Sequence, residues 1–199
     1  MRYKTGFTLL LSLFAIPAFS AARPVFAQNG PDARLDRMKK LDFLAGNWKG
    51  MGWVEIIPGN RIDLSGSEIV HCQLGGRVVQ IEGAHTNGAP AGSTGNAALK
   101  PISNQPVEIR DFVLISYDPK SDGYTVRLYK PDGSFVDGHA VLSGPNTVAW
   151  QNKQAAHLNV RLTINVDQNG EWSQTREFTT DGRNWKTYFK MILMKTEGD

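Results

Sequence analysis

The sequence predicts an all-β fold, an antiparallel meander barrel of about ten strands (lipocalin-like) with one short N-terminal helix. Apolar and polar residues alternate strictly over 158–166, which indicates a strand with one buried face. Turn-forming pairs such as Asn169-Gly170 and Asp181-Gly182 recur along the chain at spacings of roughly 10 to 20 residues. A helical spacing of apolar residues occurs in only one place, before the first strand.

The first 27 residues have the layout of a secretory signal peptide. Arg2 and Lys4 precede an apolar run over 7–19, and small residues occupy positions −3 and −1 before a cleavage point after Ala27. The apolar run is shorter than the about 20 residues that a membrane span needs. We therefore expect a cleaved signal peptide (1–27) and a periplasmic or secreted mature chain with no stable membrane insertion.

Charge and cysteine content narrow the class of protein further. Three of the 22 basic residues lie in 1–27, which holds no acidic residue, so the other 19 balance the 19 Asp and Glu residues. Nucleic-acid binding needs an excess of Lys and Arg, so no nucleic-acid partner is expected. Cys72 is the only cysteine, which excludes an internal disulfide, and its apolar surroundings suggest a small buried side chain.

The helical pattern lies at the start of the mature chain. Residues 28–40 form a polar lead-in and the start of the helix, and apolar residues at three-residue spacing predict that the helix covers 35–44. Gly46 ends it. The barrel domain is predicted to cover 41–196.

Every later segment has the pattern of strands and turns. The predicted strands are 47–57, 62–73, 77–84, 107–117, 123–130, 134–142, 146–152, 158–166, 171–179 and 184–194. Closed into a barrel, they would leave an interior cavity; a two-sheet sandwich is the alternative fold. The stretch 85–106, rich in Gly, Ala, Ser, Asn and Pro, is predicted to be a long flexible loop.

Four segments carry a resemblance to a known family. They are Leu41–Gly50, which contains Gly-x-Trp, the Gly-Gly turn Leu74–Arg77, the Tyr-Asp pair in Tyr117–Pro119, and the closing hairpin Asp181–Trp185. In this order they resemble the bacterial lipocalin-like family of unknown function, which is related to nitrobindin-like and fatty-acid-binding barrels. The resemblance covers about 40–195.

The resemblance implies an antiparallel barrel with an internal cavity, and it implies no reaction. Gly46 would let the chain bend into the first strand, and Trp48 would close the base of the barrel. A basic side chain from the last strand, Lys190 or Lys195, would pack over Trp48 as a cation–π contact. Nitrobindin-like barrels bind haem through a histidine near the C-terminal end, whereas the last histidine here is His157.

No motif for catalysis or metal binding stands out. The four histidines lack metal-ligand spacing, and the chain has neither a nucleophile elbow nor a phosphate-binding loop. No metal and no cofactor are therefore predicted. A catalytic set can still assemble from scattered residues, so the sequence leaves enzyme activity unsupported without excluding it.

Strand periodicity indicates which residues of each strand lie on the same face. One face of the ninth strand would carry Trp172, Arg176 and Phe178. By the same parity, one face of the last strand would carry Trp185, Thr187, Phe189, Met191 and Leu193. The candidate ligand-binding residues are Arg176, Trp172, Phe178 and Phe189.

Arg176 is the most informative of these residues, because a buried guanidinium needs an anionic partner. That partner would be a carboxylate of a bound ligand, or a glutamate such as Glu68 or Glu82, unless Arg176 faces outward.

Three functional hypotheses follow. The first is an exported protein that binds a small apolar or amphipathic molecule in the barrel cavity. The second is an envelope enzyme, a hydrolase or isomerase of small lipophilic compounds, which uses the same cavity; a polar cluster on the inner wall would favour it. The third is a structural or interaction protein of the envelope. The sequence does not specify the ligand or the oligomeric state.

Overall fold

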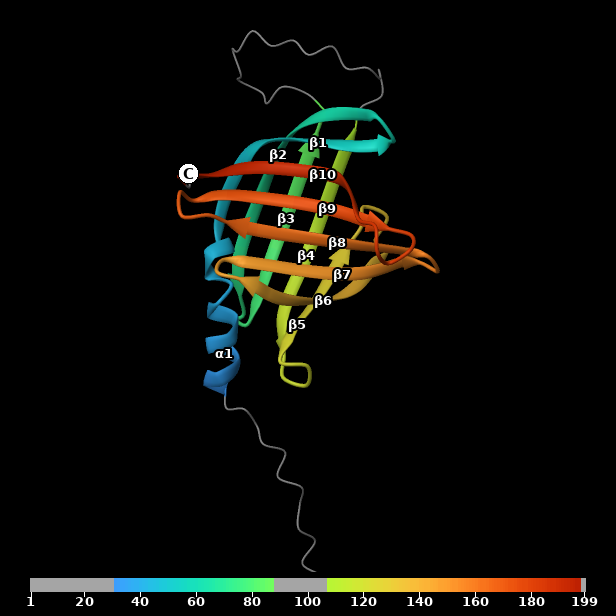
Figure 1. Ribbon diagram of the computed structural model, residues 1–199. Coiled ribbons are helices and arrows are strands. Elements are labelled where there is room, and N and C mark those ends of the chain that lie inside the picture. Colours follow the sequence, from blue (N-terminus) through green and yellow to red (C-terminus); the bar gives the residue numbers. More distant parts are fainter. Residues whose placement is uncertain (1–30, 88–106, 198–199) are drawn as a thin grey trace, which may run out of the picture.

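The computed structural model describes residues 31–87 and 107–197, and it confirms the all-β fold (Figure 1). Ten antiparallel strands close into one barrel in the order β1-β10-β9-β8-β7-β6-β5-β4-β3-β2, so each strand pairs with its sequence neighbours and β1 pairs with β10. The strands are β1 (Gly46–Ile57), β2 (Asn60–Gln73), β3 (Val78–Thr86), β4 (Glu108–Asp118), β5 (Gly123–Tyr129), β6 (Phe135–Gly144), β7 (Thr147–Ala155), β8 (Leu158–Val166), β9 (Glu171–Thr179) and β10 (Lys186–Thr196).

Each predicted strand has a counterpart whose ends lie within three residues of the predicted ones. β3 continues to Thr86, two residues into the predicted loop, and residues 88–106 of that loop lie outside the described residues. The predicted signal peptide lies outside them as well. The part of the chain that the structure describes contains no helix with the length and apolarity of a membrane span.

The predicted helix is two shorter elements. α1 (Pro31–Lys39) is followed by a turn and by the 3₁₀ helix η1 (Asp42–Leu44). Met38, Leu41 and Leu44 are all buried, and the amide of Leu44 donates to the carbonyl of Leu41 (3.0 Å). A 3₁₀ helix has three residues per turn, so three-residue spacing suits this tighter winding better than a continuous α-helix. The break lets the chain turn from α1 into β1.

The contact between β1 and β10 closes the barrel. The pairing extends from Asn47 opposite Thr196 to Val54 opposite Phe189. Gly50 makes the close approach possible, because a Cβ atom at this position would collide with the carbonyl oxygen of Ile192. Closure leaves the sheet without an unpaired edge and separates an inner face from an outer one.

One end of the barrel is closed by its own side chains. Trp48 is 2% exposed, packs against Trp172 with 5.2 Å between ring centroids, and donates its indole N–H to the carbonyl of Leu44 (2.9 Å). The ammonium of Lys195 lies 5.5 Å from the centroid of the Trp48 ring. The cation–π partner of Trp48 is therefore Lys195, and Lys190 pairs in register with Trp53 instead.

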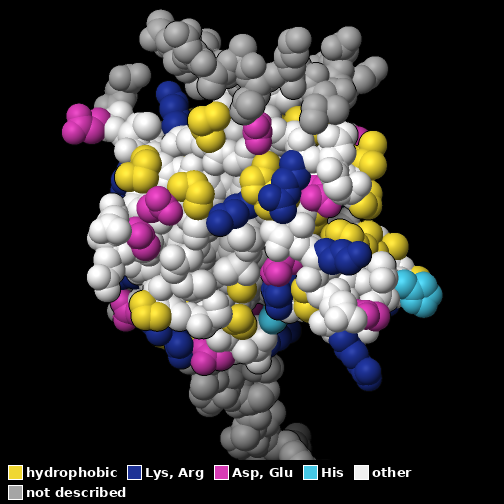
Figure 2. Space-filling model, turned by 45° about the horizontal axis from the view of Figure 1, so that its top comes forward, with side chains coloured by type: hydrophobic (Ala, Val, Ile, Leu, Met, Phe, Trp, Pro, Cys, Tyr) yellow, Lys and Arg dark blue, Asp and Glu magenta, His cyan; other side chains and the backbone are white. Residues whose placement is uncertain are grey.

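The outer surface of the barrel is mixed in character. On the face shown in Figure 2, hydrophobic side chains form small groups separated by basic and acidic side chains. The large exposed hydrophobic residues are Met51, Ile56, Ile57, Ile69, Leu74, Phe135, Val141 and Met194.

Cys72 is exposed, so the prediction that it is buried was wrong. It lies at the end of β2, where the strand leads into the exposed β2–β3 turn and is no longer covered by the barrel core. Partial burial and the nearby Asp42 carboxylate both raise the pKa of its thiol.

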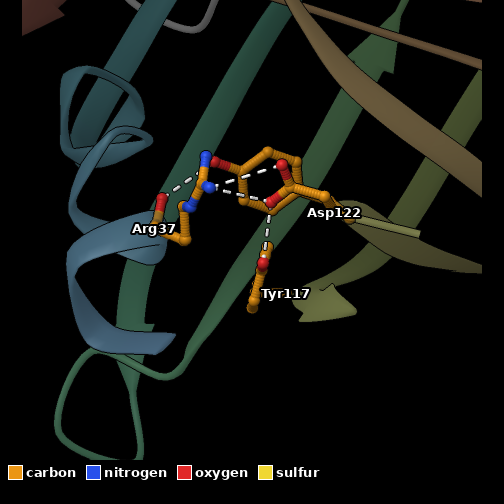
Figure 3. Close-up of polar contacts among 4 residues, drawn as sticks. Arg37, Tyr117 and Asp122 are labelled. Atoms are coloured by element: carbon orange, nitrogen blue, oxygen red, sulfur yellow. Dashed lines mark hydrogen bonds and ion pairs between the residues drawn. The ribbon is translucent and has the colours of Figure 1, made fainter. Parts of the chain in front are cut away.

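α1 lies beside the closed end and is tied to it by side chains from β4, β5 and the turn between them (Figure 3). The guanidinium of Arg37 lies 3.0 Å from the carboxylate of Asp122, which also accepts a hydrogen bond from the hydroxyl of Tyr117 (2.8 Å). The hydroxyl of Tyr124 donates to the main-chain carbonyl of Arg37 (2.8 Å). The Tyr124 bond is the more sheltered, because Tyr124 is buried whereas Arg37 and Asp122 are largely exposed.

We expect Tyr124→Phe to lower the free energy of unfolding by about 1 kcal/mol, because it removes the shorter of the two hydrogen bonds that the Arg37 carbonyl accepts, the other being a 3.3 Å bond from the Lys40 amide. Tyr117→Phe is the matched control, since it removes a hydroxyl bonded to an exposed carboxylate and should cost less. Urea unfolding followed by circular dichroism measures both variants. An equal or larger loss in Tyr117→Phe would contradict this account of how α1 is held.

Candidate functional site

A row of polar side chains crosses the interior of the barrel. We call it the inner polar chain; its members are His85 from β3, Glu68 from β2, Gln174 and Arg176 from β9, and Asp111 from β4. All five side chains are buried or nearly so. Since buried charge is costly unless it is paired, the contacts along this row decide whether the interior is stable.

The first pair of the inner polar chain is His85 and Glu68. Nε2 of His85 lies 3.2 Å from Oε1 of Glu68, and His85 is 0% exposed. Glycines stand opposite both residues in the β2–β3 ladder, Gly66 opposite His85 and Gly83 opposite Glu68. A Cβ atom at Gly66 would lie 2.5 Å from Cδ2 of His85, and one at Gly83 would lie 2.7 Å from Oε2 of Glu68. The glycines therefore supply the space that these two polar side chains occupy.

Gln174 connects the two ends of the inner polar chain. With its nitrogen toward Glu68 (3.1 Å) and its oxygen toward Arg176 (3.2 Å), the amide satisfies both charged neighbours. The opposite orientation accepts a hydrogen bond from the Trp172 indole (3.3 Å) but turns oxygen toward the carboxylate and nitrogen toward the guanidinium. We assign the first orientation, because contacts with charged groups are the stronger ones.

The second charged pair is Arg176 and Asp111. Nη2 of Arg176 donates to Oδ2 of Asp111, and both side chains are 12% exposed. The guanidinium also lies 4.4 Å from the centroid of the Phe189 ring. Burial alone would lower the pKa of Arg176, but the Asp111 carboxylate and the hydrogen bond to it raise that pKa above its usual value. Arg176 therefore stays a cation, and its counter-ion is supplied by the protein.

A cavity of about 170 Å³ lies on the Asp111–Arg176 side of the inner polar chain. Its apolar wall consists of Leu128, Trp150, Val160 and Leu162. Its polar wall consists of Asp111, Lys130, Asn152, Gln154, Arg176 and Tyr188. These residues come from β4, β5, β7, β8, β9 and β10, except Lys130, which lies in the turn after β5, and most of them lie toward the barrel end opposite α1.

A second, much smaller void lies beside this cavity. It measures about 10 Å³, is bordered by Glu68, Gln174 and Arg176, and holds one water molecule at most. Of these two spaces between described residues, the cavity has room for a ligand, and its floor is the pair of Asp111 and Arg176.

Tyr188 reaches the cavity because of a bulge in β10. The β9–β10 register shifts between Thr187 and Phe189, which pair with Glu177 and Arg176, and Tyr188 is the extra residue. Burial raises the pKa of the Tyr188 phenol, and the neighbouring Arg176 opposes this rise. The hydroxyl is therefore protonated at neutral pH and is available as a hydrogen-bond donor.

Because of the bulge, the predicted parity of the last strand was wrong for the residues that precede Tyr188. Phe189, Met191 and Leu193 are buried as expected, but Thr187 is exposed. Trp185 does not lie on the inner face. Instead, the guanidinium of Arg161 lies over its indole ring, 4.4 Å from the centroid of that ring. Strict alternation ends where one strand carries an extra residue.

The four candidate ligand-binding residues lie at different places. Arg176 lines the cavity. Trp172 packs against Trp48 at the closed end, and Phe189 lies between His85 and Arg176 in the core. Phe178 packs edge-on against Tyr188, with 5.9 Å between ring centroids. Of the four, the described cavity wall includes Arg176 alone.

Sequence reasoning missed the acidic partner of Arg176, although the signal was present. Asp111 has the same parity as Ile109, Val113 and Ile115, so the alternation of β4 already places an acid on the inner face. His85 and Glu68 carry the same signal on β3 and β2. Neither Glu68 nor Glu82, the two glutamates predicted as possible partners, binds Arg176 directly. Glu68 reaches Arg176 only through Gln174, and Glu82 is exposed on β3.

Possible metal ligands do not converge in the parts of the chain that the structure describes, where three or more His, Cys, Asp or Glu side chains never come together in one group.

Asp111→Asn should destabilise the fold strongly, by about 3–5 kcal/mol, because it leaves the Arg176 cation buried without a counter-charge. Asp137→Asn is the matched control: it breaks an exposed pair with Arg127 and should have little effect. The double variant Asp111→Asn/Arg176→Gln should recover part of the loss. Thermal and urea unfolding measure all three, and equal costs for the two single variants would refute the role given to Asp111.

Comparisons with known proteins support the fold. No protein-family model matches the chain, and no curated protein matches it significantly. Among solved structures, the chain is similar to the crystal structure of Rv2717c from M. tuberculosis, with a TM-score of 0.51 and 13% sequence identity. The match covers 81% of this chain and 98% of that one. At this identity the likeness shows the barrel fold alone.

Proposed function

We propose that this protein is an exported lipocalin-like barrel that binds a small amphipathic molecule in the cavity beside Asp111 and Arg176. The observation that carries the proposal is the cavity itself, about 170 Å³ in volume, with one apolar wall and one polar wall. Ligand sites combine apolar walls with a few polar groups that fix orientation, and this cavity has both.

The size of the cavity limits the ligand. An apolar cavity of about 150 Å³ admits benzene, whereas sites for drug-sized ligands have volumes of about 300–1,000 Å³. The ligand is therefore the size of one ring with a substituent, and a long acyl chain is too large. Six polar residues in the wall make an amphipathic ligand a better match than a purely apolar one.

An enzyme that uses the same cavity is the second candidate, and the inner polar chain is the observation that favours it. Two features favour binding over catalysis. His85 and Glu68 face each other behind the floor of the cavity, and Asp111 is already held by Arg176. A general base needs access to the proton that it removes, which the described geometry does not give His85 or Glu68.

An interaction protein of the envelope is the third candidate. It has less support, because the hydrophobic side chains on the face shown in Figure 2 form small groups rather than one extended surface.

Export is part of the proposal. We expect the chain isolated from its native cells to begin at Gln28, with the mass of residues 28–199, and to be found in the periplasmic or extracellular fraction. Intact-mass measurement with N-terminal sequencing tests this, with a variant carrying Asp in place of Leu10, Leu11 and Phe14 in the apolar run as the control that should stay unprocessed. A full-length chain in the cytoplasmic fraction would contradict export.

Val160→Phe should abolish ligand binding without unfolding the barrel, because it fills the cavity from its apolar wall. Val141→Phe is the matched control, since Val141 is 53% exposed on the outside. Native mass spectrometry of the mature chain, incubated with a set of single-ring compounds, measures bound ligand in each variant, and circular dichroism checks the fold. Equal ligand retention in Val160→Phe and the parent chain would argue against this cavity as the site.

A further inference from the structure

The polar wall of the cavity holds hydrogen-bond donors that have no partner within the described part of the protein. The hydroxyl of Tyr188 and the ammonium of Lys130 belong to residues that line the cavity, and neither group makes a hydrogen bond or ion pair with a described residue. Tyr188 is partly buried and Lys130 is exposed, and the Arg176 cation lines the same cavity. This wall is therefore suited to receive acceptor atoms from outside the chain.

Two acceptors of the wall already have donors within the protein. Oδ2 of Asp111 accepts from Arg176, and Oδ1 of Asn152 accepts from Nε2 of Gln154 (2.9 Å). Because Asp111 balances the charge of Arg176, Lys130 leaves the residues of the cavity wall with one positive charge in excess. Free donors and this additional cation together favour an anionic group over a neutral one or a cation.

The apolar wall determines which hydrophobic part of a ligand fits the cavity. Trp150 is almost completely buried, and it presents its surface to the cavity together with Leu128, Val160 and Leu162. An indole offers a planar surface on which another ring stacks favourably. The volume of about 170 Å³ holds one ring and one small substituent.

We propose that the cavity binds a planar organic anion the size of a monocyclic aromatic carboxylate, with its ring against Trp150 and its carboxylate toward Arg176, Tyr188 and Lys130. This inference rests on the proposed function and names its ligand class. The carboxylate accepts from the Tyr188 hydroxyl and faces the Arg176 cation, and Lys130 balances its charge, so the bond between Asp111 and Arg176 stays in place.

Isothermal titration calorimetry of the mature chain, Gln28 onward, tests the ligand class with three probes. Benzoate carries the ring and the charge, benzamide has nearly the same shape without the charge, and decanoate has the charge on a long chain. We expect benzoate to bind at least about tenfold more tightly than benzamide, since hydrogen bonds to a charged group are worth about 1.5–3 kcal/mol. Decanoate should not bind.

Two variants test the residues without disturbing the Asp111–Arg176 pair. Tyr188→Phe removes one hydroxyl and keeps the ring, and Lys130→Met removes the charge and keeps the length of the side chain. Each should weaken benzoate binding about tenfold and leave benzamide binding nearly unchanged. Lys153→Met is the matched control, because Lys153 lies on β7 between the cavity residues Asn152 and Gln154 and has the opposite parity.

The outcomes separate this inference from the proposed function. Binding of benzamide as tight as that of benzoate, or an unchanged benzoate affinity in both Tyr188→Phe and Lys130→Met, would overturn the anion inference and leave a small-molecule site in place. Binding of decanoate would overturn the size limit. If neither ring compound binds, and native mass spectrometry with the set of single-ring compounds is also negative, both proposals fail.

Discussion

The pairing of β1 with β10 is the constraint on which the rest of the structure depends. It turns a ten-strand meander into a closed barrel and gives every strand an inner face and an outer face. The close approach at Gly50 leaves no room for a side chain between the two strands. Once the barrel is closed, polar residues at inward parity cannot turn to solvent, so they must find partners across the interior.

The inner polar chain is the consequence of that confinement. Residues from β2, β3, β4 and β9 meet in the interior, where Gln174 joins a carboxylate–imidazole pair to a carboxylate–guanidinium pair. On one side of the chain the barrel is packed down to Trp48, Trp172 and α1. On the other side lies the cavity. The same Arg176 that stabilises the interior through Asp111 also lines that cavity, which connects the stability of the barrel to its proposed binding site.

The fold was predictable to a large extent, because each strand has a clear alternation and each turn has turn-forming residues. The site was predictable only in part. Arg176 was singled out from its parity between apolar residues, and the parity of β4 would have indicated Asp111 in the same way. The bulge between Thr187 and Phe189 was not predictable, because alternation is assumed to continue until a partner strand shows that it does not. Tyr188 was therefore missed, and Trp185 was assigned to the wrong face.

By itself, the sequence determined the all-β class, the ten strands and the two faces of most strands, and it made Arg176 a candidate for the inner face, because these follow from local periodicity and turn chemistry. Only the tertiary structure decided which inward residues meet. The partners Asp111 and Arg176 are 65 residues apart in the chain, and their contact depends on barrel closure and strand register rather than on any local pattern. The same reason applies to the cavity: its walls come from six strands and one turn, and its volume is whatever their side chains leave unfilled.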